Sequence, residues 1–372
     1  MRRPARSRAD EFRAALVPWV LARVLVLAGL ALARYLVSHT HPAAAGTAVR
    51  AHEGLLGWDA GFYRDIAAFG YARLPRQALR FFPLVPLLAR ALSYVTTLSR
   101  GASLLVVSNL AALVAGMLVY RLAGRETGDS DLARRAAWLL AVAPPAYVLV
   151  MGYSESTMLV FVLAAFLAAR SRRWLWAAAF GYLAGLTRPL GVLLAGGLAV
   201  EALRAWRADR RRLAPALVAT IAPLAGAATY MGWVAARFGS FWLPVTIQQQ
   251  HNLRGHFANP VTTVLDDTRG LFHGHIGTGL HVPWLAVLVV LAVVAFRLWP
   301  ASYALFGLLV LGLAASSANL DSLERYALSA FPFILTGAAL TADQRVERSV
   351  LTLFGGALMA YSVLAFLNAV VP

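Results

Sequence analysis

The sequence has 372 residues, of which 60% are hydrophobic and 14% are charged, and its mean hydropathy is +0.66. This composition excludes a soluble globular domain and predicts an all-helical polytopic membrane protein. The absence of cysteine excludes disulfides and thiolate metal sites. The 34 basic residues are all arginine, which is typical of a GC-rich bacterial genome, and the formal net charge is +17. The positions of these arginines, given below, explain the charge without a nucleic-acid partner.

Apolar runs recur along the whole chain, many of them close to the roughly 20 residues that a membrane-spanning helix needs. We expect a single integral membrane domain over residues 1–372, with about 10–12 transmembrane helices. The predicted spans cover residues 16–37, 101–120, 132–150, 155–169, 174–187, 190–206, 213–236, 282–299, 301–318, 326–341 and 349–370. The first run is too long for the apolar part of a signal peptide, so it is expected to remain as an anchor.

Clusters of arginine occupy every second connection between these spans. They lie in the N-terminal tail and near residues 121–135, 170–173, 204–212, 297 and 345–348. By the positive-inside rule, this alternation places the N-terminus in the cytoplasm of a bacterial inner membrane. Two long loops, residues 38–100 and 237–281, and a short polar loop at 316–325 then lie on the extracytoplasmic side, where we expect the chemistry.

This topology requires that residues 81–99 do not cross the membrane. Pro83, Pro86 and Arg90 favour an interfacial or re-entrant helix on the outer side, with Phe81 and Phe82 in lipid. If the segment crosses instead, every later loop changes side and the arginine clusters lie outside.

The first long loop contains Trp58 and Asp59, at the start of a segment that is compatible with a short helix. On such a helix Asp59 and Tyr63 share a face, whereas Asp65 does not. A carboxylate at the mouth of a membrane cavity can act as a general base toward a hydroxyl group. Trp58 and Tyr63 could stack on a sugar ring. The alternative is that the aromatic residues form an interfacial belt around solvated charges.

A pair of prolines, Pro144 and Pro145, is expected to break a helix just before the outer face. Tyr153, Ser154 and Glu155 follow at membrane depth, where an ionisable side chain is either functional or paired. The alternative is that Ser154 and Glu155 only begin the next helix. Both interpretations stay open.

Two further arginines lie near the outer ends of predicted spans. Arg188 has no acidic neighbour in sequence, so a lipid phosphate is its natural partner, with snorkelling as the alternative. The same argument applies to Arg325, which precedes Tyr326, although Glu324 or Asp321 could neutralise it locally.

The second long loop holds a run of neutral hydrogen-bonding groups that suits sugar hydroxyls. Gln249, Gln250 and Arg254 are the candidate contacts within it. Several histidines and aspartates lie in the same loop, but their spacing matches no zinc motif, so we predict no metal site and no cofactor.

Taken together and in order, these motifs resemble the PIG-V type of mannosyltransferase. The resemblance covers nearly the whole chain. It is carried by Trp58-Asp59, Ile66-Ala67, Gly70-Tyr71, Phe81-Phe82-Pro83-Leu84-x-Pro86-Leu87, Tyr153-Ser154-Glu155-Ser156, Thr187-Arg188-Pro189, the Gln/Arg segment at 248–254, Arg325-Tyr326 and Phe331-Pro332. The stretch 72–79 lacks the acidic residue of the eukaryotic members.

The resemblance implies a GT-C glycosyltransferase fold, with interfacial helices in the first outer loop. It implies a polyprenyl-phosphate sugar donor, with mannose or a related sugar, and an inverting transfer without an obligatory metal. By position, Asp59 matches the general base of the family. From charge and depth we expect Arg188 and Arg325 to bind the donor phosphate, with Tyr153, Ser154, Glu155 and Tyr326 around the donor. Membrane lipids and a lipid-linked or cell-envelope acceptor are the expected partners.

Two other classes of function compete with this one. A transporter or flippase of a lipid-linked sugar would also need charge within the membrane and a broken helix. The chain shows no inverted repeat, and its polar residues concentrate on one side of the membrane. A non-catalytic subunit of an envelope-glycan complex would make Asp59 dispensable.

Overall fold

A computed structural model describes residues 8–40, 45–250, 253, 255–273 and 281–371. The described residues form helices and turns with no β-strand, although Phe257 and Ser317 make an isolated β-bridge. The helices are α1 (Arg8–Thr40), α2 (Ala45–Glu53), α3 (Asp59–Phe69), α4 (Leu84–Val95), α5 (Arg100–Thr127), α6 (Ser130–Val142), α7 (Glu155–Arg170), α8 (Trp174–Thr187), α9 (Leu194–Ala208), α10 (Leu213–Phe238), α11 (Leu243–Gln248), α12 (Pro260–Phe272), α14 (His281–Leu298), α15 (Ala301–Ala315), α16 (Leu323–Leu328), α17 (Phe331–Leu340) and α18 (Gln344–Phe366). The all-helical prediction is confirmed.

Six described helices are long and apolar enough to cross a membrane, namely α1, α5, α9 with the turn before it, α10 with the turn before it, α14 and α18. Shorter apolar helices, including α8, α15 and α17, pack among them. Two of the predicted spans are interrupted. The run at 132–150 is α6 followed by a 3₁₀ turn, and the run at 326–341 is divided between α16 and α17.

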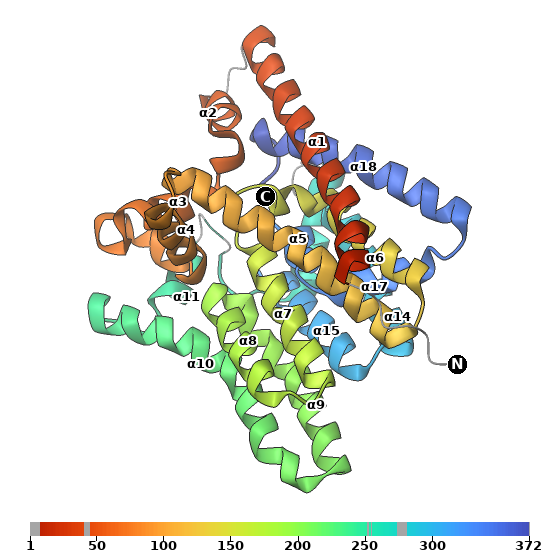
Figure 1. Ribbon diagram of the computed structural model, residues 1–372. Helices are drawn as coiled ribbons and strands as arrows, with labels where there is room; N and C mark the ends of the chain where they lie inside the picture. The colour runs from red at the N-terminus through yellow and green to blue at the C-terminus, as the bar shows by residue number, and fades with distance from the viewer. Residues whose placement is uncertain (1–7, 41–44, 251–252, 254, 274–280, 372) are drawn as a thin grey trace.

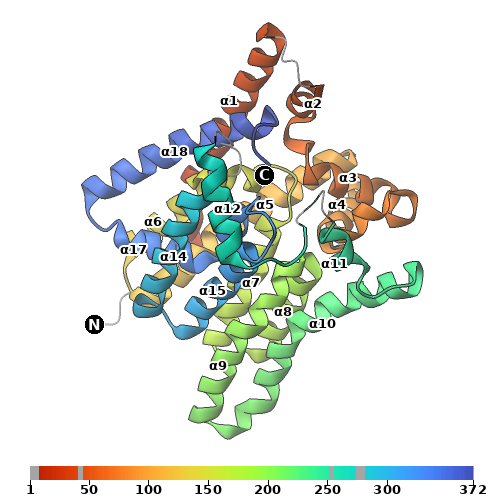
Figure 2. The same ribbon diagram turned by 180° about the vertical axis from the view of Figure 1, so that it is seen from behind.

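The helices pack in two groups that meet at α5 and α7 (Figures 1 and 2). α1 lies against α18 and α5 at one end of the molecule, while α8, α9 and α10 form a layered group at the other. Their shared core consists mainly of small and aliphatic side chains, and within it Phe166, Tyr303, Phe306 and Phe331 pack mostly edge to face. Two of the long helices, α5 and α18, begin with a side-chain cap. Ser99 accepts a hydrogen bond from the Ala102 N–H at the start of α5.

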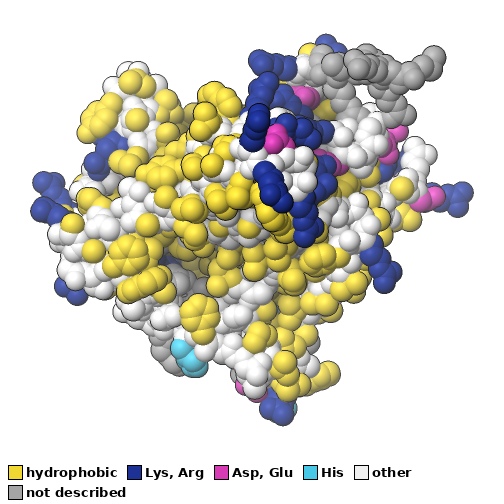
Figure 3. All heavy atoms as spheres, turned by 90° about the horizontal axis from the view of Figure 1, so that it is seen from below, with side chains coloured by type: hydrophobic (Ala, Val, Ile, Leu, Met, Phe, Trp, Pro, Cys, Tyr) yellow, Lys and Arg dark blue, Asp and Glu magenta, His cyan; other side chains and the backbone are white. Residues whose placement is uncertain are grey.

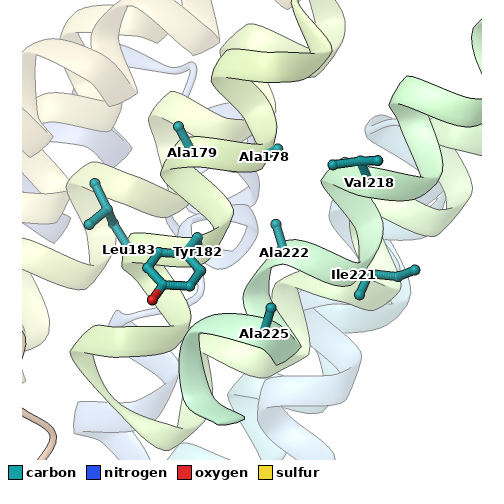
Figure 4. A pocket seen from close by; sticks show the side chains of 8 residues that line it. All are labelled: Ala178, Ala179, Tyr182, Leu183, Val218, Ile221, Ala222 and Ala225. Carbon is teal, nitrogen blue, oxygen red and sulfur yellow. The ribbon is translucent and has the colours of Figure 1, made fainter. Parts of the chain in front are cut away.

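Close packing of α8 and α10 depends on glycine. A Cβ atom on Gly185 would lie 1.9 Å from the carbonyl oxygen of Pro223, and one on Gly226 would lie 2.0 Å from that of Tyr182. Small residues allow two membrane helices to approach at backbone contact. An apolar groove of about 620 Å³ remains on the outer surface of this helix pair, as Figure 4 shows. Its lining contains no charged group, so we place no chemistry there.

The segment from α3 to α4 folds into a small unit of its own. α3, the turns after it and α4 share a hydrophobic cluster with Leu104 of α5, separate from the main core. At twelve residues, α4 is about 18 Å long, against a hydrocarbon thickness of about 30 Å. The prediction that Phe81 and Phe82 lie in lipid is wrong. Both are buried, Phe81 against Phe62 and Phe82 against Tyr230, because the loop folds back onto α10.

A set of ion pairs lies where α5 and α7 end, with Glu126 and Glu201 largely buried and the arginines partly exposed. Glu126 forms a two-bond ion pair with Arg170, at 2.7 and 3.0 Å, and accepts a hydrogen bond from the Tyr303 hydroxyl at 3.0 Å. Glu201 lies 3.8 Å from Arg170 and 3.5 Å from Arg204. We call Glu126, Arg170, Glu201 and Arg204 the Glu126 cluster. It joins α5, α7, α9 and, through Tyr303, α15.

The α9–α10 hairpin projects from the body of the molecule. Figure 3 looks at the molecule from this end and shows arginine side chains gathered beside a broad apolar surface. The hairpin contributes Arg204, Arg207, Arg210, Arg211 and Arg212 to this end. Arginines grouped beside apolar surface fit the head-group region of a membrane.

Candidate active site

The local fold places Glu155 at the start of α7, deep inside the protein. The predicted break at the paired prolines is confirmed, because α6 ends at Val142 and residues 144–149 form a 3₁₀ turn. The chain then turns through Gly152 and Tyr153 before α7 begins at Glu155. Its side chain is only 2% exposed, so its charge requires a partner.

Two arginines form ion pairs with the Glu155 carboxylate. Arg188 forms an ion pair with Glu155, and Arg325 approaches the same carboxylate oxygen through its Nε at 2.9 Å. Arg188 lies in extended backbone between α8 and the 3₁₀ turn after it, whereas Arg325 is on the short helix α16. Both guanidinium groups are less than a tenth exposed. Charges this deeply buried are costly unless they are paired.

Arg325 links Glu155 to Asp59. Its Nη1 donates a hydrogen bond to Asp59 Oδ2 at 2.9 Å, although the two residues are 266 positions apart in sequence. Asp59 is the first residue of α3, and its side chain is 22% exposed, the most open of the acidic groups here. Arg80 Nη2 lies 3.8 Å from the other oxygen of Asp59.

We call Asp59, Arg80, Glu155, Arg188 and Arg325 the Asp59 cluster. It contains three arginines and two carboxylates, so its formal charge is +3 − 2 = +1. The excess positive charge, together with the partial exposure of Asp59, makes this cluster a candidate site for an anion.

Aromatic and hydroxyl side chains surround the cluster. The ring of Tyr326 lies 5.3 Å from the Arg188 guanidinium and 5.4 Å from that of Arg325, within cation–π range. Tyr153 stacks against Arg325 at 5.2 Å, and its hydroxyl lies 3.4 Å from the Asp59 N–H. The Tyr63 and Ser154 hydroxyls are 2.7 Å apart. These contacts fix the charged groups in place.

The ionisation of Asp59 reflects two opposing effects. Burial raises the pKa of the Asp59 carboxyl, but the charges of Arg325 and Arg80 and the hydrogen bond from Arg325 outweigh it. The pKa of Asp59 therefore lies below its ordinary value, and the group is a carboxylate at neutral pH.

The structure thus brings together the residues that the sequence singled out at four distant places. Asp59, Glu155, Arg188 and Arg325 are in one cluster, with Tyr153, Ser154 and Tyr326 beside it. The sequence left open whether Glu324 neutralises Arg325 locally. Glu324 instead contacts the His281 Nδ1 at 2.7 Å, and Arg325 pairs with distant carboxylates.

The structure describes only part of the segment 237–281. Gln249 is partly exposed and Gln250 exposed after the end of α11, while Arg254 lies outside the described residues. Among the described residues of this segment, Gln248 reaches the cluster, and its Oε1 accepts a hydrogen bond from Arg80 at 3.4 Å. Sequence reasoning did not select Gln248 or place Arg80 beside Asp59. The polar run after α11 and the arginine before Phe81 were the available signals.

The indole of Trp58 is held by contacts with other protein groups. Its indole N–H donates to the Ala365 carbonyl at 3.0 Å, and the Arg50 guanidinium covers its ring at 4.3 Å. Tyr63 is likewise buried.

The sequence model of the family described as Mannosyltransferase (PIG-V) matches residues 28–224, more than half of the chain. The chain belongs to the PIG-V mannosyltransferase family. The six long apolar helices fit the multi-pass membrane architecture that the resemblance implied. Residues 28–224 include Asp59, Arg80, Glu155 and Arg188.

Two solved structures similar to this chain are both from Archaeoglobus fulgidus. The oligosaccharyltransferase complex with zinc and sulfate is 15% identical over 83% of this chain and 48% of its own, with a TM-score of 0.45. The archaeal oligosaccharyltransferase AglB, with an inhibitory peptide and a dolichol-phosphate, is 14% identical over 83% of this chain and 51% of its own, with a TM-score of 0.41. The chain thus spans about half the length of these proteins. No curated protein matches it.

Proposed function

We propose that this protein transfers a mannosyl or related residue from a polyprenyl-phosphate donor to a lipid-linked or cell-envelope acceptor, with inversion, on the extracytoplasmic face. The observation that carries the proposal is the Asp59 cluster. A partly exposed carboxylate lies within 4 Å of two arginines, in a site with one excess positive charge. A base next to an anion site is the arrangement that attack on a phosphate-activated sugar requires.

In the proposed reaction, Asp59 takes the proton of the acceptor hydroxyl as its oxygen attacks the anomeric carbon of the donor sugar. The bond between that carbon and the phosphate oxygen breaks, and the bonding pair leaves with the polyprenyl phosphate. Negative charge on the phosphate grows as this bond breaks. Arg325 and Arg188 would therefore stabilise the transition state more than the ground state. In this proposal arginines supply the positive charge, and neither a metal nor a cofactor takes part.

Donor binding would also tune the base. Without donor, burial raises the pKa of Asp59, but Arg325 and Arg80 lower it by more. The low pKa weakens the carboxylate as a proton acceptor. A phosphate bound to these arginines would place negative charge beside Asp59 and raise its pKa. Asp59 would then be a stronger base only when the donor is in place.

The acceptor is proposed to approach from the outer loops. Asp59 is the most exposed acidic group of the cluster, and Gln248 and Arg80 lie next to it. Gln249, Gln250 and Arg254 follow Gln248 in the chain and are the proposed contacts for acceptor hydroxyls. The contacts of Trp58 and Tyr63 with protein groups favour a supporting role for these two residues over direct stacking on a sugar.

The extracytoplasmic placement has a direct test, because the chain contains no cysteine. A single cysteine at Thr47, in the first outer loop, should react with an impermeant thiol reagent in intact cells. A cysteine at Ser130, in an arginine-flanked connection, should be labelled only after permeabilisation. The opposite labelling pattern would place the Asp59 cluster on the cytoplasmic face.

The activity itself is tested with purified protein, radiolabelled undecaprenyl-phosphate mannose and a membrane-lipid extract from the source cells. Label should move into a product that resists the mild acid that cleaves the donor. Reconstituted vesicles test the competing class. If labelled donor crosses the bilayer without any transfer, the protein is a flippase and the proposal is wrong.

A further inference from the structure

The backbone of Trp58 has a conformation that a residue with a side chain rarely adopts. Its φ is 57° and its ψ is −132°. These angles correspond to the first central position of a type II′ turn, about +60° and −120°, which glycine dominates. The Ala60 N–H donates to the Gly57 carbonyl at 3.2 Å and closes the turn. A tryptophan is therefore held in a strained position directly before Asp59.

The side chain of Trp58 is anchored on two sides. The indole N–H donates to the carbonyl of Ala365, near the end of α18, at 3.0 Å. The guanidinium of Arg50, from α2, lies 4.3 Å from the ring centre. Strained backbone persists only where the surrounding structure fixes it. These two contacts tie the turn to segments on either side of it, including one more than 300 positions away in sequence.

The turn determines where the carboxylate of Asp59 points. Asp59 is the second central residue of the turn and the first residue of α3, so a change of ψ at Trp58 rotates everything that follows. The carboxylate has to reach Arg325 at 2.9 Å and Arg80 at 3.8 Å. Relaxation of Trp58 into an ordinary backbone region would move Asp59 away from both.

We propose that Trp58 is a positioning residue, whose anchored indole holds a strained turn that directs Asp59 into the cluster. This inference rests on the proposed function, in which Asp59 acts on the acceptor hydroxyl. It differs from a role in which the tryptophan ring stacks on a sugar, because here the ring acts only through the backbone.

Trp58→Ala and Trp58→Gly form a matched pair that separates the two roles. Both remove the indole, but only glycine adopts the II′ backbone without strain. We expect kcat to fall on the order of 10²-fold in Trp58→Ala, since a misplacement of about 1 Å can have that effect. Trp58→Gly should recover roughly tenfold of that loss. The KM values for undecaprenyl-phosphate mannose and for the lipid extract should change little.

Thermal unfolding of the same pair gives an independent readout. At an ordinary position glycine is less stable than alanine, because its unfolded chain is more flexible. At Trp58 we expect the reverse order, with the glycine variant unfolding at the higher temperature. Equal activity of the two variants, with a raised KM for the lipid extract, would instead assign the ring to the acceptor and overturn the positioning role.

Combination with Asp59→Asn shows whether Trp58 acts through Asp59. If it does, Trp58→Ala should cause no further loss in the Asp59→Asn background, because coupled residues are not additive. An active Asp59→Asn enzyme would refute the proposed base, whatever Trp58 does. An inactive Asp59→Asn enzyme together with a fully active Trp58→Ala enzyme would refute the positioning role alone.

Discussion

The two ends of α7 carry the same kinds of side chain in different arrangements. Glu155 begins the helix in the Asp59 cluster, and Arg170 ends it in the Glu126 cluster, fifteen residues or about 22 Å away. The Asp59 cluster has three arginines against two carboxylates, whereas the Glu126 cluster has two of each. One end has charge left over for a ligand, and the other is balanced within the protein.

The backbone differs in the same way. Around Asp59 it is irregular, with Trp58 and Ser322 at positive φ and Arg188 in extended backbone after α8. The Glu126 cluster is built from regular helices, and the hydroxyls of Ser302 and Tyr303 complete its hydrogen bonds. Buried ion pairs are therefore not in themselves a sign of function. An excess of one charge in a partly exposed cluster, next to strained backbone, is the more specific sign.

The strongest test of this contrast is Asp59→Asn. The amide keeps the size of the side chain but cannot accept the proton, so transfer should fall by about 10²–10⁴-fold. Donor binding and thermal stability should stay close to those of the wild type. The measurement is transfer by purified protein, with donor binding followed by equilibrium dialysis. Activity within a few-fold of wild type would remove the base from the Asp59 cluster.

The next largest effect is expected when Arg188 or Arg325, which supply the excess positive charge of the Asp59 cluster, is replaced. Replacement of either by alanine should lower kcat/KM for the donor by at least about tenfold, or about 1.4 kcal/mol, because the phosphate loses a guanidinium partner. Arg188→Lys retains the charge but not the planar fork, so it should be impaired less than Arg188→Ala.

Alanine at these sites also leaves Glu155 or Asp59 with one partner fewer, so stability has to be measured in parallel. The lysine variant keeps that charge compensation and serves as the folding control. Normal donor kinetics in both alanine variants would show that the phosphate is bound elsewhere.

The Glu126 cluster should respond in the opposite way. Glu126→Gln removes the ion pair with Arg170 and weakens the hydrogen bond that the Tyr303 hydroxyl donates to residue 126. The unfolding temperature should therefore fall by a few degrees. We assign this cluster to helix packing, so the kcat of the folded enzyme should remain within about twofold of wild type. A large loss of kcat without a loss of stability would erase the difference between the two clusters.

The smallest expected effect is a change in pH dependence. The positive charge of Arg80 favours the ionised form of Asp59 and so contributes to its lowered pKa. In Arg80→Gln that pKa should rise, and the activity that needs the carboxylate should be lost at a higher pH as the solution is acidified. The acid limb of the kcat/KM profile measures this. Arg64→Gln is the control, since Arg64 pairs with the exposed Asp65.

The sequence predicted which residues form the site better than it predicted which of them contact each other. Charge at membrane depth was sufficient to select Asp59, Glu155, Arg188 and Arg325, because an ionisable side chain there needs a partner. It could not show that Arg325 pairs with Asp59, since that contact depends on how α3 and α16 pack. The surroundings of Phe81 and Phe82 were missed for the same reason. Their apolar character suits lipid and protein equally, and only the fold of the loop decides between them.

The position of Arg325 so late in the chain has a consequence for biosynthesis. The four members of the Asp59 cluster that are made first, Asp59, Arg80, Glu155 and Arg188, carry two positive and two negative charges. The surplus positive charge arrives only when α16 is inserted, after most of the membrane helices have been made. Under the proposed function, a nascent chain would therefore have no net attraction for a lipid phosphate at this site. Arg325 would confer the affinity for an anion only on the nearly complete protein.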